Sequence, residues 1–441
     1  MGKIVIIGAG IGGLTAAKIL NRAGYDVNIY EKKDKKELGY HWSDEVATRA
    51  FNEKPIQTLD KKYYHKKNNW ILRFPKKVNE IKLNIPYEQL GMLVDRKELI
   101  NHLINQIGNT KIYFNTSVDK VYIKDDKVKG VIINNKIIEA SLVIDNSGVI
   151  SNFKKNLPKS YFIEEKINND DLFCVYRNIY KSTVDKYSIN PISKVYIKHL
   201  NRNGISWFIV DDKKDIDILV GKLNSINEDE IRESLDALCE DNKCIKKEIK
   251  EKSMYRIPVR YPLSKMVGNG YVAIGDSAYM TIPILGSGIE NSINAGQILG
   301  ETIVNCKNNP LSIENIWQYQ VKYYKEYGYR HCAIDVYKRW LMYTDNDDLN
   351  KTISSGLVGN KEFESIMQGE IIKLSLFDYF KKAKKGIKNK KLLFSLLKLL
   401  INSKKAMRIA KSIPKTYNED RVNAWARKID KFYQNLYIKK E

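Results

Sequence analysis

Runs of apolar residues separated by polar turns divide the chain into strands and helices. The run Ile4–Ile7 is apolar at every position, which is typical of a strand buried on both faces of a parallel sheet. A glycine-rich turn, a helix over 11–23 and a second strand over Val27–Tyr30 follow it. This order predicts a βαβ unit at the start of the chain.

The same patterns predict the later elements. Leu99, Leu103 and Ile107 recur at helical spacing, so 97–107 is predicted to be a helix. A strand that ends at Gly275 is followed by a helix to Val304, and the chain beyond residue 309 reads as helical. Strands are predicted within 61–82 and over 111–114, 118–123, 128–133, 141–145, 205–210 and 216–221.

We therefore predict an α/β fold with a discontinuous dinucleotide-binding domain, which is interrupted by an antiparallel-sheet domain for the substrate and followed by a helical domain. The length of 441 residues agrees with two or three domains. The predicted limits are 1–60, 90–153 and 257–305 for the first domain, 61–89 and 154–256 for the second, and 306–441 for the third.

The first turn has the spacing of a dinucleotide-binding motif. Gly8 permits the tight turn, Gly10 lets the backbone approach a pyrophosphate, and Gly13 lets the helix lie close to the strand. The helix N-terminus then directs its N–H groups toward the phosphates. Glu31 ends the second strand, where a carboxylate accepts ribose hydroxyls. An ordinary glycine-rich turn is the weaker interpretation, because strand, helix and acid are all in place.

A second motif lies far along the chain. Asp276 follows a buried strand and can accept hydrogen bonds from the cofactor's hydroxyl groups. Gly286 and Gly288 let the backbone lie against a flat ring, and the following helix N-terminus stabilises the negative charge of a reduced flavin. Together the two motifs indicate FAD rather than a nicotinamide nucleotide. The candidate FAD-binding residues are Gly8, Ala9, Gly10, Gly13, Glu31, Lys32, Arg96, Gly148, Gly275, Asp276, Gly286, Ser287, Gly288 and Ile289.

Arg96 belongs to this set because it stands at the start of the predicted helix 97–107, from which a guanidinium can reach the cofactor's phosphates or its adenosine. A surface arginine is an equally good interpretation of that position alone.

The charge of the chain is strongly positive. It has 75 Lys and Arg against 52 Asp and Glu, a net charge of +23. Such a balance favours anionic partners, although a genome rich in A and T also enriches lysine codons. Nucleic acid is not predicted, because no RNA- or DNA-binding motif is present and the lysines are scattered. The five cysteines form no CxxC pair, which fits a reduced, cytoplasmic protein without an iron–sulfur site.

One segment near the end combines apolar and basic residues. The lysine-rich stretch 381–391 precedes the apolar stretch 392–401, and a basic helix continues through Lys411. The apolar stretch is too short to span a bilayer, and no signal peptide is recognisable. We expect either a helix that lies on an anionic membrane surface, which would make the protein peripheral to the cytoplasmic face, or a packed helix with a solvated flank.

The order of the motifs resembles that of the geranylgeranyl reductase family of flavoproteins, above all the archaeal enzymes that saturate the prenyl chains of ether-lipid precursors. The resemblance covers nearly the whole chain. The matching segments are 8–13, 145–148, 257–263, 275–278, 283–288, 327–340 and 413–425.

The resemblance implies a fold and a reaction. The fold is a Rossmann-type FAD domain of the p-hydroxybenzoate-hydroxylase kind, a catalytic sheet over a hydrophobic tunnel, and a helical C-terminal domain. In the reaction, hydride passes from N5 of reduced FAD to one carbon of a C=C bond in a prenylated lipid or phospholipid, and a proton reaches the other carbon. The absence of a nucleophile with a partner base agrees that the cofactor carries the chemistry. The electron donor stays open, because no second GxGxxG is present.

Two segments depart from the family pattern. Trp42 stands where the family often has a cysteine that faces the flavin, and Trp207 alone remains of a Tyr-x-Trp-x-Phe-Pro signature. We hypothesise that Trp42 and Trp207 wall the pocket above the flavin, with His41 or Asp44 as a proton relay. For both tryptophans, the alternative is a buried core aromatic.

Two other functions fit the same fold. The first is an aromatic monooxygenase or halogenase, although the Trp-x-Trp-x-Ile-Pro segment of halogenases is absent. The second is a prenyl-binding carrier that has lost its flavin, against which the intact glycine motifs argue.

Overall fold

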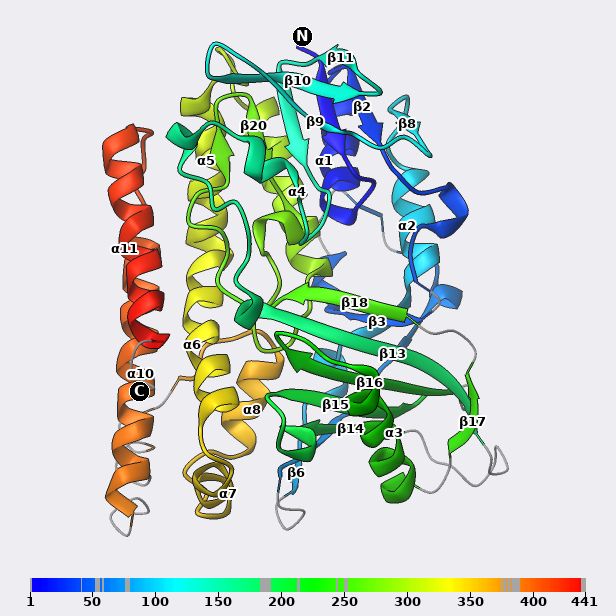
Figure 1. The fold of residues 1–441 in the computed structure, drawn as a ribbon, viewed down its shortest axis with the longest axis vertical. Coiled ribbons are helices and arrows are strands. Elements are labelled where there is room, and N and C mark those ends of the chain that lie inside the picture. The colour runs from blue at the N-terminus through cyan, green and yellow to red at the C-terminus, as the bar shows by residue number, and fades with distance from the viewer. Residues whose placement is uncertain are drawn as a thin grey trace.

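The computed structural model describes residues 2–40, 42–51, 56–57, 59–75, 80–182, 192–211, 215–242, 245–249, 253–373, 375, 378, 382 and 389–437. The N-terminal sheet lies at the top of Figure 1, the large sheet below it, and the C-terminal helices along one side. Short 3₁₀ turns occur at Lys35–Glu37, Thr48–Ala50, Lys61–Tyr63, Tyr87–Gln89, Phe153–Asn156, Lys159–Tyr161, Asn169–Asp171, His199–Asn201 and Gly275–Ala278.

The N-terminal sheet has the order β19-β20-β12-β1-β2-β8, and all of its pairs except β19–β20 are parallel. Strands β1, β2 and β12 are buried at every position, as was predicted for the apolar run of β1. The strands are β1 (Ile4–Ile7), β2 (Val27–Tyr30), β8 (Lys111–Tyr113), β12 (Leu142–Asp145), β19 (Val267–Gly268) and β20 (Tyr271–Ala273).

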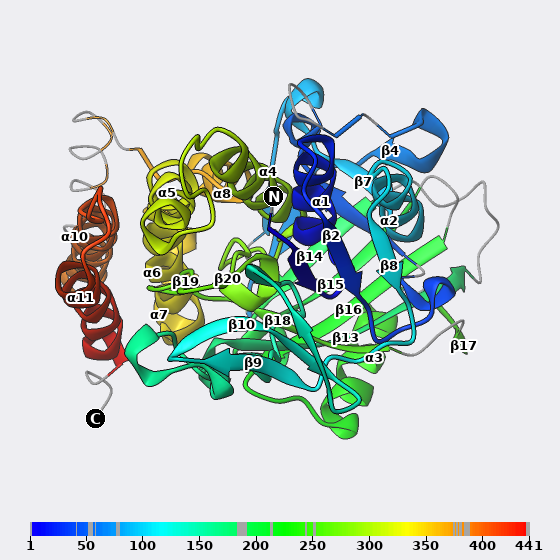
Figure 2. The ribbon, with the colours of Figure 1, turned by 90° about the horizontal axis from the view of Figure 1, so that it is seen from above.

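Two helices and a small antiparallel sheet cover the faces of the N-terminal sheet. Figure 2 shows α1 (Ile11–Arg22) and α4 (Ile289–Val304) on one face and the antiparallel sheet on the other. The helices approach closely because Gly296 has no side chain: a Cβ there would stand 2.4 Å from the carbonyl oxygen of Gly12. The antiparallel sheet consists of β9 (Lys120–Lys124), β10 (Lys127–Ile133) and β11 (Lys136–Glu139).

The large sheet has the order β17-β13-β16-β15-β14-β5-β6, with β18 paired to β13. Alternation along β15 directs Phe208 and Val210 toward Leu238 of α3 (Glu228–Asn242), whereas Ile209 belongs to the apolar cluster of the opposite face. The strands are β5 (Trp70–Arg73), β6 (Glu80–Lys82), β13 (Leu172–Ser182), β14 (Ile192–Ile197), β15 (Gly204–Val210), β16 (Asp215–Leu223), β17 (Ile245–Ile249) and β18 (Ser253–Pro258).

A three-stranded antiparallel sheet, here called the small sheet, carries part of the segment that departs from the family pattern. Its order is β3-β7-β4, with β3 (Ser43–Val46), β4 (Tyr64–Lys66) and β7 (Met92–Asp95). Helix α2 (Arg96–Ile104) continues from β7; it begins one residue earlier and ends three residues earlier than predicted. Because β4 pairs with β7 and not with the large sheet, residues 64–66 depart from the predicted assignment of 61–89 to the substrate sheet. The domain limits stay a prediction.

Where the structure describes the chain beyond residue 309, it is mostly helical, as expected. Figure 1 shows α10 and α11 as the outer layer beside α5 and α6. Lys338 and Arg339 of α6 form buried ion pairs with Asp171, the residue just before β13, and these pairs join the helical region to the large sheet. The elements are α5 (Ile313–Tyr323), a π-helical turn (Tyr324–Gly328), α6 (Tyr329–Tyr343), α7 (Asn346–Ser354), α8 (Asn360–Met367), α10 (Lys390–Lys411) and α11 (Glu419–Tyr437).

Candidate functional site

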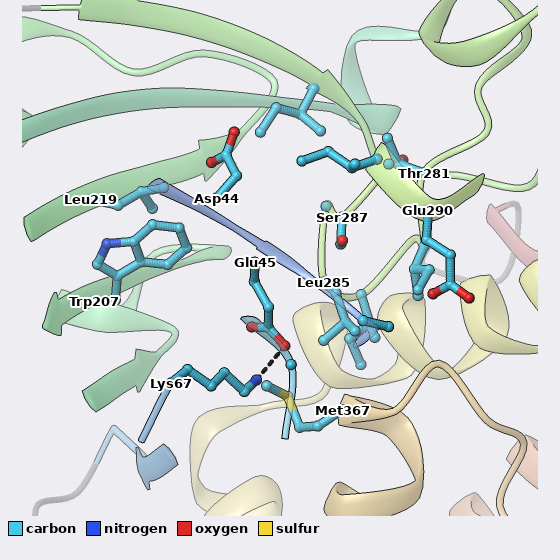
Figure 3. A pocket seen from close by; sticks show the side chains of 18 of the residues that line it. Asp44, Glu45, Lys67, Trp207, Leu219, Thr281, Leu285, Ser287, Glu290 and Met367 are labelled. Carbon is cyan, nitrogen blue, oxygen red and sulfur yellow. Dashed lines mark hydrogen bonds and ion pairs between the residues drawn. The ribbon is translucent and has the colours of Figure 1, made fainter. Parts of the chain in front are cut away.

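A cavity of about 750 Å³ lies between the N-terminal sheet and the large sheet. Both predicted motifs reach it, since its lining includes Gly10 at one end and the loop 286–289 beside it. Figure 3 shows Asp44 and Glu45 on opposite faces of their strand in the small sheet, and Trp207 from the large sheet. The rest of the lining is largely apolar and includes Leu72, Phe173, Val195, Ile197, Ile205, Ile209, Leu219, Leu341, Met342, Phe363, Ile366 and Met367.

The first motif packs against the polar turn after β12. The amide of Asn146 donates to the carbonyl oxygen of Gly8 at 3.0 Å. A Cβ at Gly10 or Gly13 would stand 2.6 or 2.7 Å from Asn146 Nδ2, and Gly8 has φ +90°. These three glycines are therefore required by the protein's own packing. Gly10 lines the cavity, whereas Gly8 and Gly13 support the turn from behind.

Glu31 holds this turn in place. Its Oε2 accepts the N–H of Ala9 at 2.8 Å and its Oε1 accepts the N–H of Lys33 at 2.9 Å. Ionised carboxylates have about four acceptor positions, so two remain for the predicted ribose contact. Neither Glu31 nor Ala9 lines the cavity, and Lys32 is exposed outside it. The structure therefore does not bring Lys32 to the site.

The second motif forms one wall of the cavity. Gly275 and Asp276 begin the 3₁₀ turn after β20, and Gly286 has φ +66° in the loop that leads to the N-terminus of α4. All of them line the cavity, as do Ser287, Gly288 and Ile289. Burial raises the pKa of Asp276 above its ordinary value, and the charge of Arg96 opposes that rise.

The cavity lining fits a dinucleotide cofactor. Gly148 has φ +95° and no heavy atom within 4 Å of the place where a Cβ would be, so its backbone is open to a ligand. The Nε of Arg96 is buried without a hydrogen-bond partner among the described residues. A buried guanidinium N–H suits a phosphate or hydroxyl oxygen. Arg96 thus lines the cavity, and its contact with the cofactor stays a prediction.

Aromatic rings form the opposite wall. Trp42 stacks on Tyr40 with ring centroids 4.8 Å apart and meets the edge of Tyr255 at 4.9 Å. The ring centroids of Trp207 and Trp70 lie 6.2 Å apart. Trp42 and Trp207 both line the cavity, although Trp42 is also buried among its neighbours.

Arg177 of β13 joins these two tryptophans. Its guanidinium carbon is 4.7 Å from the ring centroid of Trp42 and 4.9 Å from that of Trp207. Its N–H groups donate to Asp217 at 3.0 Å, to Asp44 at 2.7 Å and to the carbonyl of Ser43 at 2.7 Å. A buried guanidinium between two indole faces is strongly ordered. Arg177 therefore fixes the small sheet to the large sheet above the cavity.

The residues predicted as proton relays differ in their placement. His41 lies outside the described residues. Asp44 accepts hydrogen bonds from Arg177 and from Trp42 Nε1, the latter at 3.1 Å, and lies 3.7 Å from Arg96. The carboxylate of Asp44 is thus held by side chains of the cavity wall and does not point into the cavity without a partner.

Sequence reasoning missed Arg177, Asn146 and the ion pair of Glu45 with Lys67. Asn146 and Glu45 lay inside segments whose motifs were recognised, next to the residues that were chosen. Arg177 and Lys67 gave no signal, because a single basic residue in a strand-rich segment is ordinary in so basic a chain.

Known proteins resemble this chain along most of its length. The NAD(P)-binding Rossmann-like domain family matches residues 6–68. The digeranylgeranylglycerophospholipid reductase of Sulfolobus acidocaldarius is 23% identical, over 97% of this chain and 96% of that protein. The protein of the same name from Methanosarcina acetivorans is 25% identical, over 89% and 95%. The predicted resemblance is confirmed.

Solved structures share the fold. A geranylgeranyl bacteriochlorophyll reductase-like protein from Thermoplasma acidophilum has a TM-score of 0.72 with 19% identity, over 90% of this chain and 99% of that one. The flavin-dependent brominase Bmp2 has a TM-score of 0.58 with 14% identity, over 88% and 99%. The structure of CtdE with FAD has a TM-score of 0.55 with 16% identity, over 90% and 100%. The predicted fold class is confirmed, and FAD is the cofactor that the comparisons support.

Proposed function

We propose that the protein is an FAD-dependent reductase that saturates C=C bonds in the prenyl chains of ether-lipid precursors. The observation that carries this proposal is the cavity, in which glycine-rich turns suited to a dinucleotide open directly onto a lining of aliphatic and aromatic side chains. The names of the curated relatives from Sulfolobus and Methanosarcina support the same reaction.

The chain's own residues supply binding, alignment and exclusion of water. The turns at Gly10, Gly275 and 286–289 would hold FAD, with Arg96 at a polar part of it. When bound in reduced form, FAD supplies a hydride for one carbon of the alkene. Trp42 and Trp207 would close the wall opposite the loop 286–289, because Arg177 holds both rings. The aliphatic lining would align the prenyl chain and keep water away.

The test supplies electrons chemically and follows the lipid. Purified protein is loaded with FAD, reduced with dithionite without oxygen and given a digeranylgeranyl glycerophospholipid in detergent. We expect mass spectrometry to find one added hydrogen pair per saturated bond. Bound FAD with no saturation would overturn the proposal. A hydroxylated or halogenated product after addition of oxygen would favour the monooxygenase or halogenase, and protein that takes up no FAD would favour the carrier.

We also propose that the protein attaches peripherally to an anionic membrane surface through α10. Among the described residues, no helix is long and apolar enough to cross a bilayer. On α10, Phe394 is 70% exposed, Ile401 is 65% exposed, and Leu397 is exposed between them. Apolar and basic side chains on one outer face suit an anionic lipid surface. The exposed residues of this face are Lys391, Phe394, Leu397, Lys398, Ile401, Lys404, Lys405, Arg408 and Lys411.

The proposed location follows from this attachment: the cytoplasmic face of the membrane, where a prenylated lipid is within reach of the cavity. We retain the predicted three-part division of the chain as part of the proposal. The large sheet and the helices α6 and α8 would then form the prenyl tunnel, because side chains from all three line the cavity.

A further inference from the structure

An ion pair inside the cavity has no part in the function proposed so far. Glu45 of β3 and Lys67, which follows β4, form a salt bridge. Figure 3 shows their side chains meeting in the cavity, with Leu285 and Ser287 on one side and Trp207 on the other. The Lys67 side chain is 4% exposed and the Glu45 side chain is 33% exposed. The pair is thus covered by protein except where Glu45 faces the cavity.

The small sheet positions this pair. The side chain of Glu45 passes over Gly91, where a Cβ would stand 3.3 Å from both Cγ and Oε1 of Glu45. The N–H of Lys67 donates to the carbonyl of Gly91 at 3.4 Å, and its Nζ lies 5.6 Å from the ring centroid of Trp70. Two strands and a glycine therefore direct the carboxyl group of Glu45 into the cavity.

Other acids along the lining are less suited to donate a proton there. Asp44 is held by Arg177 and Trp42. Glu290 pairs with the half-exposed Arg49 at 2.6 Å. Asp276 lies in the turn that the proposed function assigns to FAD and not to the prenyl chain.

The cavity makes the charged form of the pair costly. Two opposite charges beside apolar side chains lose hydration, and water that enters the open cavity offsets part of that loss. A prenyl chain that fills the cavity expels this water. This loss of hydration costs a charged pair more than a neutral pair, so it promotes transfer of a proton from Lys67 Nζ to the Glu45 carboxylate.

We propose that Glu45 is the catalytic acid that protonates the second alkene carbon, and that Lys67 is a positioning residue that supplies the proton. The inference rests on the proposed function. Saturation adds a hydride to one carbon, and the π electrons form the C–H bond to the proton from Glu45 at the other. Glu45 is left as a carboxylate and Lys67 as a neutral amine, which takes a proton from water when the saturated chain leaves.

The first test observes the proton without catalysis. Infrared difference spectra are recorded on FAD-loaded protein, with and without a diphytanyl glycerophospholipid, which fills the cavity but has no double bond. We expect a protonated-carboxyl band to appear with the lipid in the wild type and to be missing in Glu45→Gln. Glu88→Gln, a change of an exposed acid at the edge of the cavity, should keep the band. A wild type that binds the lipid without this band would overturn the inference.

The second test measures lipid saturation in a single turnover after dithionite reduction. General acids contribute about 10²- to 10⁴-fold, so Glu45→Gln should lose about that much. Glu45→Asp should retain part of the rate that Glu45→Gln loses. Lys67→Met should shift the pH dependence of the saturation rate. FAD retention and reduction by dithionite should be unchanged in all variants. Equal rates in the wild type and Glu45→Gln would overturn this inference and leave the proposed function standing, whereas a wild type that saturates no lipid would overturn both.

Discussion

The guanidinium carbon of Arg177 lies 4.9 Å from the ring centroid of Trp207, and the opposite tryptophan, Trp42, is 4.7 Å away. Removal of this charge takes the main cationic partner from Asp217 and Asp44, whose side chains are only 14% and 22% exposed. A broken buried ion pair costs about 3–5 kcal/mol. We therefore expect Arg177→Met to lower the urea midpoint strongly and to raise the accessibility of the two tryptophans to acrylamide quenching.

Arg202 provides a matched control for Arg177. It pairs with Glu230 and Glu233 on the outer side of the large sheet, away from the cavity lining. Because these ion pairs are more exposed, Arg202→Met should cost about 1 kcal/mol or less. Equal losses of stability for Arg177→Met and Arg202→Met would contradict the assigned role of Arg177.

Gly13 should tolerate no side chain. A Cβ there would stand 2.7 Å from Asn146 Nδ2 and 2.8 Å from the Cγ2 of Ile6. Overpacking of this kind costs about 1–3 kcal/mol and should displace the turn that reaches the cofactor. We expect Gly13→Ala to retain less FAD per protein after gel filtration. Gly359→Ala is the control, because the nearest heavy atom to its Cβ is 4.0 Å away, and unchanged FAD retention in Gly13→Ala would count against the proposed cofactor cradle.

Local spacing explains what the sequence could predict. The turn at residues 8–13 and the loop 286–289 carry their chemistry within a few neighbouring positions, so their glycines were recognised before the fold was known. The apolar run of β1 likewise identified a strand that is buried throughout.

Long-range pairing explains what the sequence could not predict. Glu45 and Lys67 meet only because β3 and β4 both pair with β7, and Arg177 reaches Asp44 across two separate sheets. Neither pairing leaves a periodic pattern in the sequence. Lys32 was predicted as a cofactor contact, but its side chain lies in solvent.

The exposed face of α10 should determine binding to anionic vesicles. Each buried Phe, Leu or Ile side chain is worth about 1.5–3 kcal/mol, so the combined change Phe394→Ser, Leu397→Ser and Ile401→Ser should weaken binding at least tenfold. Sedimentation with phosphatidylglycerol vesicles measures this, and added salt should weaken wild-type binding. Ile137→Ser, a change of an exposed residue on β11, should have no effect. Equal binding to phosphatidylcholine and phosphatidylglycerol would rule out the electrostatic part of the proposal.

His331 should make stability fall in mild acid. Burial, with a smaller contribution from Arg330, lowers the pKa of His331 to about 3, below its ordinary value of 6.5. Below pH 6.5 the unfolded chain binds a proton that the folded protein does not, so acid favours unfolding. At pH 5 this linkage amounts to about 2 kcal/mol.

The His331→Phe variant isolates this contribution because it keeps a ring beside Tyr323, whose own ring lies 6.2 Å away. Urea midpoints at pH 7 and pH 5 give the comparison: the wild type should lose more stability between the two pH values than His331→Phe, by about 2 kcal/mol. Tyr323→Phe removes the hydroxyl that lies 3.5 Å from His331 Nδ1 and keeps the imidazole, so it should retain the wild-type pH dependence. If His331→Phe kept that dependence as well, the loss of stability in acid would have to come from other groups.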